Sequence, residues 1–399
     1  MVADVTPHVP LLSGWRRPRA NPSISVALKP SCWRTSSLCS PIPGARPADF
    51  LGDTVHLNRT ADRRGQLAAG TVERNDDVVQ SQLRMVFRNP KPEHDHWGME
   101  AYIEATDAAF RAVQEISGVE DPHTIAVCGA APIVVSLAGY YAARGQRNIG
   151  SMTLFVAPLD TSGMANTPGL GDFVDPKLNE VVKRWPSTKD RVGADELTLL
   201  FAMLRPNDLI WNYWVNNYLM GKQPAAFDVL YWNADGTGMT AQFNRDFRKF
   251  VDENPLARFG AMTVKGTPIA DISRFDFDSY VIGAATDHIC PWPTVYRSAQ
   301  MLGERSQFTL GGSGHIQTIV CPPGKPKASY FTNPDNSTPP EEWLRKAHKT
   351  EGTWWGHFSA WCGERSGPTV PAPSSPGSAR HHSLGKAPGT YVFEKVLWG

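Results

Sequence analysis

Three side chains in this 399-residue chain have the chemistry needed for covalent catalysis. Cys128 follows a β-rich run at residues 124–127, Asp287 follows a second run at 280–284, and His315 follows a third at 307–310. A thiolate is a strong nucleophile, and a neighbouring imidazole can take up its proton and return it. A carboxylate can hold that imidazole in the productive orientation. The three residue types therefore predict nucleophilic catalysis through Cys128, provided that the fold brings them together.

The elements between these residues predict how they are positioned. Residues 99–117 carry apolar side chains at helical spacing, and Gly118 stands where a helix C-cap belongs. Residues 133–144 form a second apolar helix that ends at Gly145. Strands that alternate with helices predict an α/β fold with a mostly parallel sheet. Because chemistry gathers at the carboxyl ends of parallel strands, the three residues are expected at one edge of this sheet.

The sequence around Cys128 is typical of a nucleophile elbow, the strand–turn–helix arrangement of α/β-hydrolase folds. In that elbow the nucleophile sits on a sharp turn with small residues two positions before and after it, and here these are Ala126 and Ala130. The backbone N–H of Gly129 would serve as an oxyanion donor, and the following helix would lower the thiol pKa. The alternative interpretation is a small buried hydrophobe, the usual role of a free cysteine. This segment alone leaves both open.

Nucleophile, acid and histidine also follow one another in the chain order of α/β-hydrolase triads. A lone Asp–His pair in a loop is more often a surface pair. Three residues at strand ends in this order favour catalysis over the structural alternative.

The composition excludes several classes of protein. The 40 basic residues balance 39 acidic ones, so a net charge of +1 provides no field for steering nucleic acid. Hydrophobic residues make up 41% of the chain, enough for a sizeable core. Residues 125–143 carry no charge and are long enough to cross a bilayer. The glycines and the proline in this stretch, and the change in residue pattern halfway along it, favour a buried strand, turn and helix. No transmembrane segment is therefore predicted.

The six cysteines are spread thinly and include no CxxC pair. This spacing predicts neither a disulfide framework nor a zinc site, and it fits a reducing compartment such as the cytoplasm. The N-terminus shows no basic start followed by an apolar run, so no secretory signal is visible. His94 and His96 could imitate a pair of metal ligands, but a loop or turn is the commoner role. No metal is predicted.

Changes in residue composition and periodicity divide the chain into four parts. Residues 1–80 mix prolines with serine and arginine without periodicity, which predicts weak order. Residues 84–160 and 276–365 are expected to form the catalytic core. Residues 161–275 break the alternation with a Gly/Pro-rich start and a block of aromatic side chains, which predicts an inserted cap. Residues 366–399 are predicted to be a Pro-rich linker followed by a closing strand.

From about residue 84 to the C-terminus, the chain resembles the polyhydroxyalkanoate synthases of the class I/II type. The matching stretches include Phe87-Arg88-Asn89-Pro90, Asp287-His288-Ile289 and Ser313-Gly314-His315. Further matching stretches lie at residues 96–98, 207–214, 218–222, 227–235, 291–292 and 322–328. The resemblance as a whole covers roughly four-fifths of the chain.

The resemblance implies polymerisation of (R)-3-hydroxyacyl-CoA into polyester, with release of CoA at the surface of cytoplasmic storage granules. It makes Cys128 the nucleophile, His315 the base and Asp287 the acid, with a part for Asp287 in activating the 3-hydroxyl group. His288 matches the family pattern, and a supporting structural role is equally open. The resemblance also suggests dimers, and it implies no cofactor.

Two departures from the family pattern keep other functions open. The family elbow reads G-x-C-x-G-G, whereas this chain has Ala126, Ala130 and Ala131 at the three glycine positions. Residues 1–80 do not match the family region that supplies early strands and a second oxyanion donor, whose loss typically costs roughly two to three orders of magnitude in rate. Two explanations are compatible with the unmatched N-terminal residues: a truncated or frame-disrupted gene product, and a true variant with a divergent N-terminal part.

Two alternative functions follow from these departures. One is an impaired homologue that pairs with an active synthase or coats granules. The other is a thiol hydrolase that degrades such esters.

Overall fold

The computed structural model describes residues 90–163, 191–204, 206–224, 238–321, 323–367 and 377–382, together with the backbone of three strands before residue 90. Its strands are β1 (Ser23–Leu28), β2 (Val55–Asn58), β3 (Gln82–Met85), β4 (His123–Cys128), β5 (Ser151–Phe155), β6 (Thr263–Val264), β7 (Thr267–Pro268), β8 (Asp278–Ala284), β9 (Ser306–Gly311), β10 (Ser329–Thr332) and β11 (His348–Glu351). Its α-helices are α1 (Met99–Ser117), α2 (Ala131–Ala143), α5 (Ala194–Met203), α7 (Ala241–Glu253), α8 (Trp292–Met301), α9 (His315–Ile319), α10 (Pro340–Lys346) and α11 (Trp355–Gly363). Short helical turns are η2 (Pro92–His94), η4 (Asn207–Trp211), η5 (Trp214–Leu219), η6 (Pro255–Ala257) and η7 (Ile272–Arg274).

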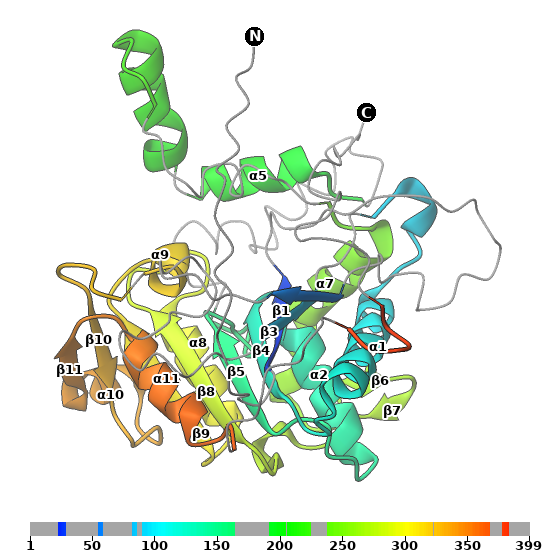
Figure 1. The fold of residues 1–399 in the computed structure, drawn as a ribbon. Coiled ribbons are helices and arrows are strands. Elements are labelled where there is room, and N and C mark those ends of the chain that lie inside the picture. The colour runs from blue at the N-terminus through cyan, green and yellow to red at the C-terminus, as the bar shows by residue number, and fades with distance from the viewer. Residues whose placement is uncertain are drawn as a thin grey trace, which may run out of the picture.

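Among the described segments, one sheet contains nine strands in the order β11-β10-β9-β8-β5-β4-β1-β3-β2 (Figure 1). The six strands from β9 to β3 pair in parallel. Antiparallel pairs lie at both edges, where β10 and β11 follow β9 and β2 pairs with β3. The predicted mostly parallel sheet is confirmed.

Apolar side chains from alternating strand positions enter two separate cores, one on each face of the sheet. Ala126 and Val281 belong to the core that α1, α2 and α8 cover, whereas their neighbours Ile125, Tyr280 and Ile282 face the core that α11 covers. Because successive strand residues point to opposite faces, this division places helices on both sides of the sheet. Burial on both faces explains why the central strands are mostly apolar.

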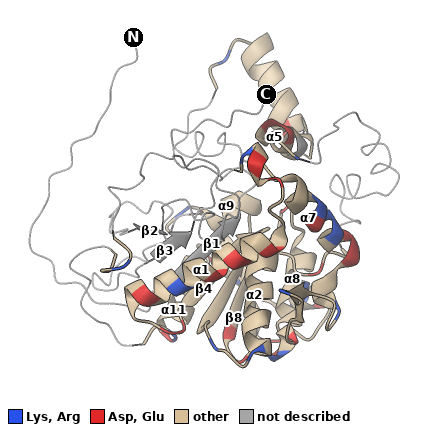
Figure 2. Cartoon of the chain, turned by 90° about the vertical axis from the view of Figure 1, so that its right-hand side faces the viewer, with Lys and Arg blue, Asp and Glu red and all other residues tan. Residues whose placement is uncertain are grey.

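The two helices predicted from periodicity are present. Helix α1 occupies the predicted residues and ends at Gly118, whose φ of 70° is left-handed and whose N–H bonds to the carbonyl of Gln114. Helix α1 carries acidic residues along its length (Figure 2), of which Glu100 and Glu115 are exposed and Glu104 and Asp107 half-buried. The uncharged stretch 125–143 forms strand, turn and the buried helix α2, as predicted. None of the helices in the described parts of the chain combines the length and apolarity needed to cross a bilayer.

Several sequence predictions fall outside the described residues. Apart from three strands, residues 1–89 are not described, so the prediction of weak order stays a prediction there. At β1 and β2 the chain joins the sheet, which the sequence analysis did not predict. The predicted strand at 390–393 and much of the predicted cap, at 164–190 and 225–237, also lie outside.

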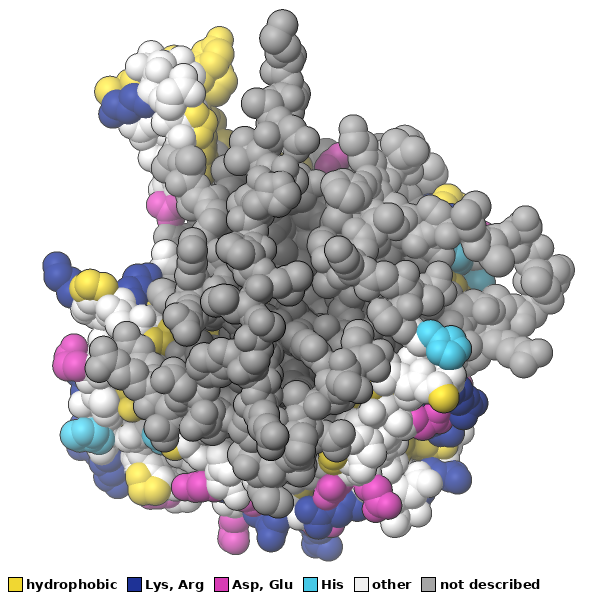
Figure 3. All heavy atoms as spheres, viewed as in Figure 1, with side chains coloured by type: hydrophobic (Ala, Val, Ile, Leu, Met, Phe, Trp, Pro, Cys, Tyr) yellow, Lys and Arg dark blue, Asp and Glu magenta, His cyan; other side chains and the backbone are white. Residues whose placement is uncertain are grey.

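The described parts of the predicted cap differ from one another. Residues 206–224, which we call the aromatic arm, project away from the sheet beyond α5 (Figures 1 and 3). In contrast, Phe243 and Phe250 of α7 are buried in the core beside α1. The ring of Phe243 lies 4.5 Å from that of Tyr102, measured between centroids.

Candidate active site

Cys128 is the last residue of β4 and lies on a strained turn. Its φ is +51°, in the left-handed region that non-glycine residues avoid at a cost of roughly 1–3 kcal/mol. The N–H of Ala130 closes the turn on the carbonyl of Val127 at 3.1 Å, and α2 begins at Ala131. This is the geometry expected of a nucleophile elbow, because the sharp turn lifts the side chain above the end of the strand.

The neighbours of Cys128 allow this turn to pack tightly. Ala126 and Ala130 are fully buried in the core under the turn. A Cβ added at Gly129 would meet no atom of the described residues within 4 Å. The small residues are therefore where strand and helix approach each other, while Gly129 is not in contact with this part of the core. The oxyanion role of the Gly129 N–H stays a prediction.

Asp287 is held by its own loop just past the end of β8. Its N–H bonds to the carbonyl of Ala284 at 3.1 Å. One carboxylate oxygen, Oδ1, accepts the N–H groups of Ile289 and Cys290, both at 2.9 Å. The side chain of Asp287 is fully buried. The loop thus fixes the carboxylate and leaves its second oxygen for one partner.

That partner is His315, the first residue of α9, which follows β9. The Nδ1–H of His315 donates to Oδ2 of Asp287 at 2.6 Å, and both side chains are buried. The two loops are also joined through the backbone, because the N–H of Thr286 bonds to the carbonyl of Ser313 at 3.1 Å. Because Nδ1 is bonded to Asp287, Nε2 is the ring nitrogen of His315 that can interact with the sulfur of Cys128.

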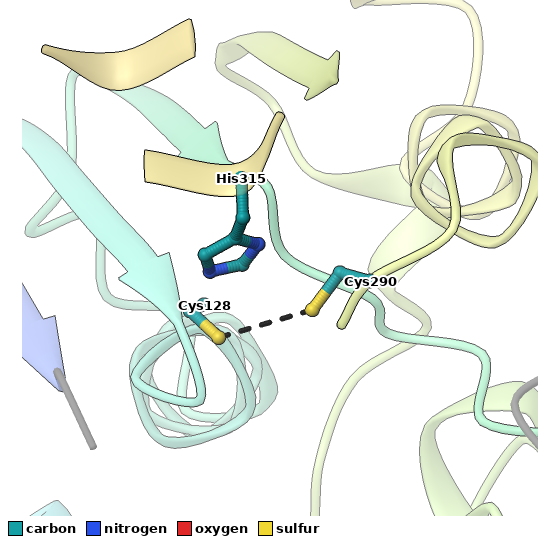
Figure 4. Close-up of side chains that lie close together, drawn as sticks. All are labelled: Cys128, Cys290 and His315. Carbon is teal, nitrogen blue, oxygen red and sulfur yellow. Dashed lines mark hydrogen bonds between the residues drawn. The ribbon is translucent and has the colours of Figure 1, made fainter. Parts of the chain in front are cut away.

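Cys290 completes the group and was missed by the sequence analysis. Its sulfur lies 3.8 Å from the sulfur of Cys128 (Figure 4). The ligand atoms of Cys128, Cys290 and His315 all lie within 4.8 Å of one another. The one available signal was that Cys290 comes three residues after Asp287, within the same tight loop.

These contacts shift the ionisation of the site in a consistent direction. The Cys290 thiol donates to the Cys128 sulfur and, with the positive charge of His315, holds the pKa of Cys128 well below its usual value despite burial. The same contact, together with burial, raises the pKa of Cys290. Burial opposes the charged form of His315, but the Cys128 thiolate and the Asp287 carboxylate raise its pKa to about 10. Both shifts favour a thiolate–imidazolium pair in the resting site.

The structure brings together the predicted residues Cys128, Asp287 and His315. His288 is half-buried beside Asp287 and is not part of the group formed by the two sulfurs and His315. Its supporting role stays a prediction. The group as a whole provides a nucleophile, a proton donor and acceptor, and an orienting carboxylate at the carboxyl edge of the sheet.

Comparison with known proteins agrees with the fold. The family model described as "alpha/beta hydrolase fold" matches residues 83–320. The chain is 43% identical to poly(3-hydroxyalkanoate) polymerase 2 of Ectopseudomonas oleovorans over 310 residues, which are 77% of this chain and 55% of that protein. It is 41% identical to polymerase 1 of the same organism over 309 residues, again 77% and 55% of the two chains.

A third relative is the poly(3-hydroxyalkanoate) polymerase subunit PhaC of Cupriavidus necator. It is 36% identical over 321 residues, which are 78% of this chain and 53% of that protein. The chain thus spans about half the length of the curated relatives that it matches.

Proposed function

The chain belongs to the alpha/beta hydrolase fold family, and from this premise we propose that it is an acyltransferase that polymerises (R)-3-hydroxyacyl-CoA into polyester and releases CoA. One observation carries the proposal: the side chains of Cys128, His315 and Asp287 meet at the carboxyl edge of the sheet, where their contacts lower the pKa of Cys128 and raise that of His315. The substrate class comes from the relatives, which are named poly(3-hydroxyalkanoate) polymerases.

The first step loads the acyl group onto the enzyme. The Cys128 thiolate attacks the thioester carbon of the acyl-CoA, and the Gly129 N–H stabilises the oxyanion. When the intermediate collapses, the carbon–sulfur bond to CoA breaks and the leaving thiolate takes the proton from Nε2 of His315. The products are a thioester on Cys128, free CoA and a neutral imidazole.

The second step extends the polymer. Neutral His315 removes the proton from the 3-hydroxyl group of an acyl unit, and the resulting oxygen attacks the thioester on Cys128. The growing chain moves to the hydroxyl oxygen, and the Cys128 thiolate is restored beside the imidazolium. Both oxygens of Asp287 are already engaged by His315 and by backbone N–H groups. We therefore assign Asp287 the role of acting through His315 in both steps.

Water must be kept from the acyl-enzyme, because hydrolysis competes with elongation. We propose that residues 161–237 supply the cap that does this. Residues 238–275 are better assigned to the core, since Phe243, Phe250 and Leu256 are buried there.

The proposal is tested with purified chain and (R)-3-hydroxybutyryl-CoA. Release of CoA thiol is measured together with the products, and polymer should accumulate. Cys128→Ala should abolish CoA release. Cys362→Ala serves as the control, because Cys362 is buried in the core on the opposite face of the sheet and should leave release close to wild type.

The products of the reaction distinguish this proposal from the alternative functions. A folded chain that releases no CoA contradicts the acyltransferase. Accumulation of free hydroxy acid in place of polymer would identify a thiol hydrolase.

A second candidate function is association with polyester granules or with an active synthase in the cytoplasm, as an impaired homologue. The aromatic arm favours it, because Tyr218 is 71% exposed, Leu219 62% and Trp211 55%. Large apolar side chains exposed together typically mark an interaction surface. Replacing Trp211, Trp214 and Tyr218 by serine should abolish binding to polyester beads if the arm binds them. Binding that is unchanged in this variant contradicts the candidate.

A further inference from the structure

We propose that Cys128, Cys290 and His315 form a binding site for a zinc-like divalent cation, and that the bound ion blocks the nucleophile. The positions of the three side chains support cation binding whatever the chain catalyses, whereas inhibition of Cys128 by the ion rests on the proposed function.

The spacing of the two sulfurs fits one tetrahedral ion. With Zn–S bonds of about 2.3 Å, two thiolates on a tetrahedral ion lie about 3.8 Å apart. The sulfurs of Cys128 and Cys290 are 3.8 Å apart, and the ligand atoms of all three residues lie within 4.8 Å of one another. The three donors therefore lie close enough together to be ligands of one ion.

The surroundings of His315 are those of a zinc-bound histidine. Its Nδ1–H is held by the buried carboxylate of Asp287 at 2.6 Å, which directs Nε2 toward the two sulfurs. Ligating histidines in zinc sites usually donate their other ring N–H to a carboxylate in this way. Asp287 also accepts the N–H of Cys290, so one loop orients both His315 and the second sulfur.

The donor set selects the class of ion. Two sulfurs and one imidazole suit zinc, whereas magnesium and calcium prefer oxygen ligands. Three protein ligands leave a fourth position for water or an incoming thiolate. Among the described residues, no atom lies within 4 Å of a Cβ placed at Gly129, which leaves room at the elbow for such a ligand.

Cys290 makes this site different from an ordinary thiol catalytic centre. Cys128 and His315 alone provide two donors, and Cys290 supplies the third. Within the part of the chain that the structure describes, no other three His, Cys, Asp or Glu side chains come together in this way. The sequence analysis predicted no zinc site, because the donors come from three loops rather than from a CxxC motif.

Zinc binding conserves charge and atoms without any redox step. The ion takes three bonds from the two sulfurs and Nε2, and two protons leave to solvent, one from Cys290 and one from the Cys128–His315 pair. No electron is transferred. While bound, Cys128 cannot attack a thioester and His315 cannot carry a proton, so removal of the ion should restore both.

The binding test uses the full chain with its thiols kept reduced, and Zn²⁺ alone as the probe. Competition with a chromophoric chelator measures affinity and stoichiometry, and Co²⁺ reports sulfur ligation by its charge-transfer absorption. We expect one ion per wild-type chain and a Kd raised at least about tenfold in Cys290→Ala. Cys362→Ala removes a buried thiol elsewhere and should bind like wild type. Circular dichroism confirms that each variant is folded.

Two results would overturn the site. One is equal affinity of wild type and Cys290→Ala for Zn²⁺, and the other is Co²⁺ bound without any thiolate absorption. The site would also be contradicted if Cys362→Ala lost as much affinity for Zn²⁺ as Cys290→Ala does.

The block is tested separately by CoA release, with each variant compared with its own metal-free rate. Zn²⁺ should inhibit wild type reversibly, with EDTA restoring the rate, and inhibition of Cys290→Ala should need at least about tenfold more Zn²⁺. Zinc that binds at this site without slowing CoA release overturns the block. A chain that binds zinc but shows no CoA release under any condition contradicts the proposed function and leaves the binding site supported.

Discussion

At the scale of single residues, the site depends on a sulfur anion that is stabilised away from bulk water. The left-handed backbone of Cys128 is strained, and its half-buried side chain sits at the end of β4. Two contacts offset the cost of burying this charge, the Cys290 thiol and the His315 imidazolium. Asp287 holds the imidazolium in place, although its own negative charge raises the pKa of Cys128. Each contact has a distinct consequence for the pH dependence of the proposed reaction.

The pH profile of kcat/KM for CoA release should show a broad plateau. The reactive form needs Cys128 deprotonated and His315 protonated. The lowered pKa of Cys128 moves the acidic limb well below the usual thiol value of about 8.5. The alkaline limb should lie near the His315 pKa of about 10, because activity is lost as the imidazolium gives up the proton that CoA needs. An acidic limb at the ordinary thiol pKa would contradict the ion pair.

Cys290→Ala removes the S–H donor that favours the thiolate, so the pKa of Cys128 should rise. The acidic limb of the same profile should therefore move to higher pH, while the alkaline limb changes little. Cys362→Ala provides the comparison, since its limbs should coincide with those of wild type.

Asp287→Asn should reduce kcat by about three to four orders of magnitude, with little change in KM. The Asn amide would donate to Nδ1 of His315 and force the ring proton onto Nε2, so His315 could no longer accept a proton there. Steady-state kinetics measure the effect, and thermal melting should show a folded chain. A loss of less than tenfold would mean that His315 does not depend on Asp287.

At the scale of elements, helix α1 shows how one backbone conformation ends a helix. Gly118 takes the left-handed conformation, and its N–H closes on Gln114. A Cβ at this position would meet no atom within 4 Å in the described part of the chain. Any effect of substituting Gly118 therefore reports backbone strain without steric contact.

Gly118→Ala should lower the free energy of unfolding by about 1 kcal/mol, since L-residues pay about that amount in the left-handed conformation. Gly356→Ala is the matched control. Gly356 lies on the exposed side of α11 with equally free space around it, and alanine there should raise stability by about 0.5–1 kcal/mol. Guanidinium denaturation measures both. Equal effects of the two substitutions would contradict the role of φ at Gly118.

At the scale of the whole molecule, the sheet is stabilised by two cores that meet only through its strands. The core under α11 is rich in rings, with Phe155 and Trp354 5.1 Å apart between centroids and Phe358 5.7 Å from Phe155. Aromatic pairs at such distances add to the free energy of burial. This core lies behind the strands that carry the site, so its packing supports the strand ends that hold Cys128 and Asp287.

Phe358→Ala should destabilise the chain by about 3–5 kcal/mol, because Phe358 is 3% exposed and its removal leaves a cavity. Phe259→Ala removes the same side chain at a position that is 82% exposed and should change stability by no more than about 0.5 kcal/mol. Guanidinium denaturation followed by tryptophan fluorescence compares the two. Similar losses in both variants would contradict the second core.

The sequence by itself determined the helices and strands nearest the site and the order of the reactive residues, because local periodicity and turn chemistry decide them. The residues of α1 and its Gly118 cap followed from apolar spacing, and three reactive residues could be assigned to strand ends. Helix α2 begins at Ala131 rather than at the predicted Ile133, because Pro132 lacks a donor N–H and fits the first helical turn.

Only the tertiary structure decided the contacts between distant segments. The approach of Cys290 to Cys128 joins residues separated by 162 positions. The insertion of β1 between β4 and β3 has no local signal either. No periodicity encodes such contacts, since they depend on how separate loops and strands pack against one another. The acidity of Cys128 and the three-donor site depend on that packing.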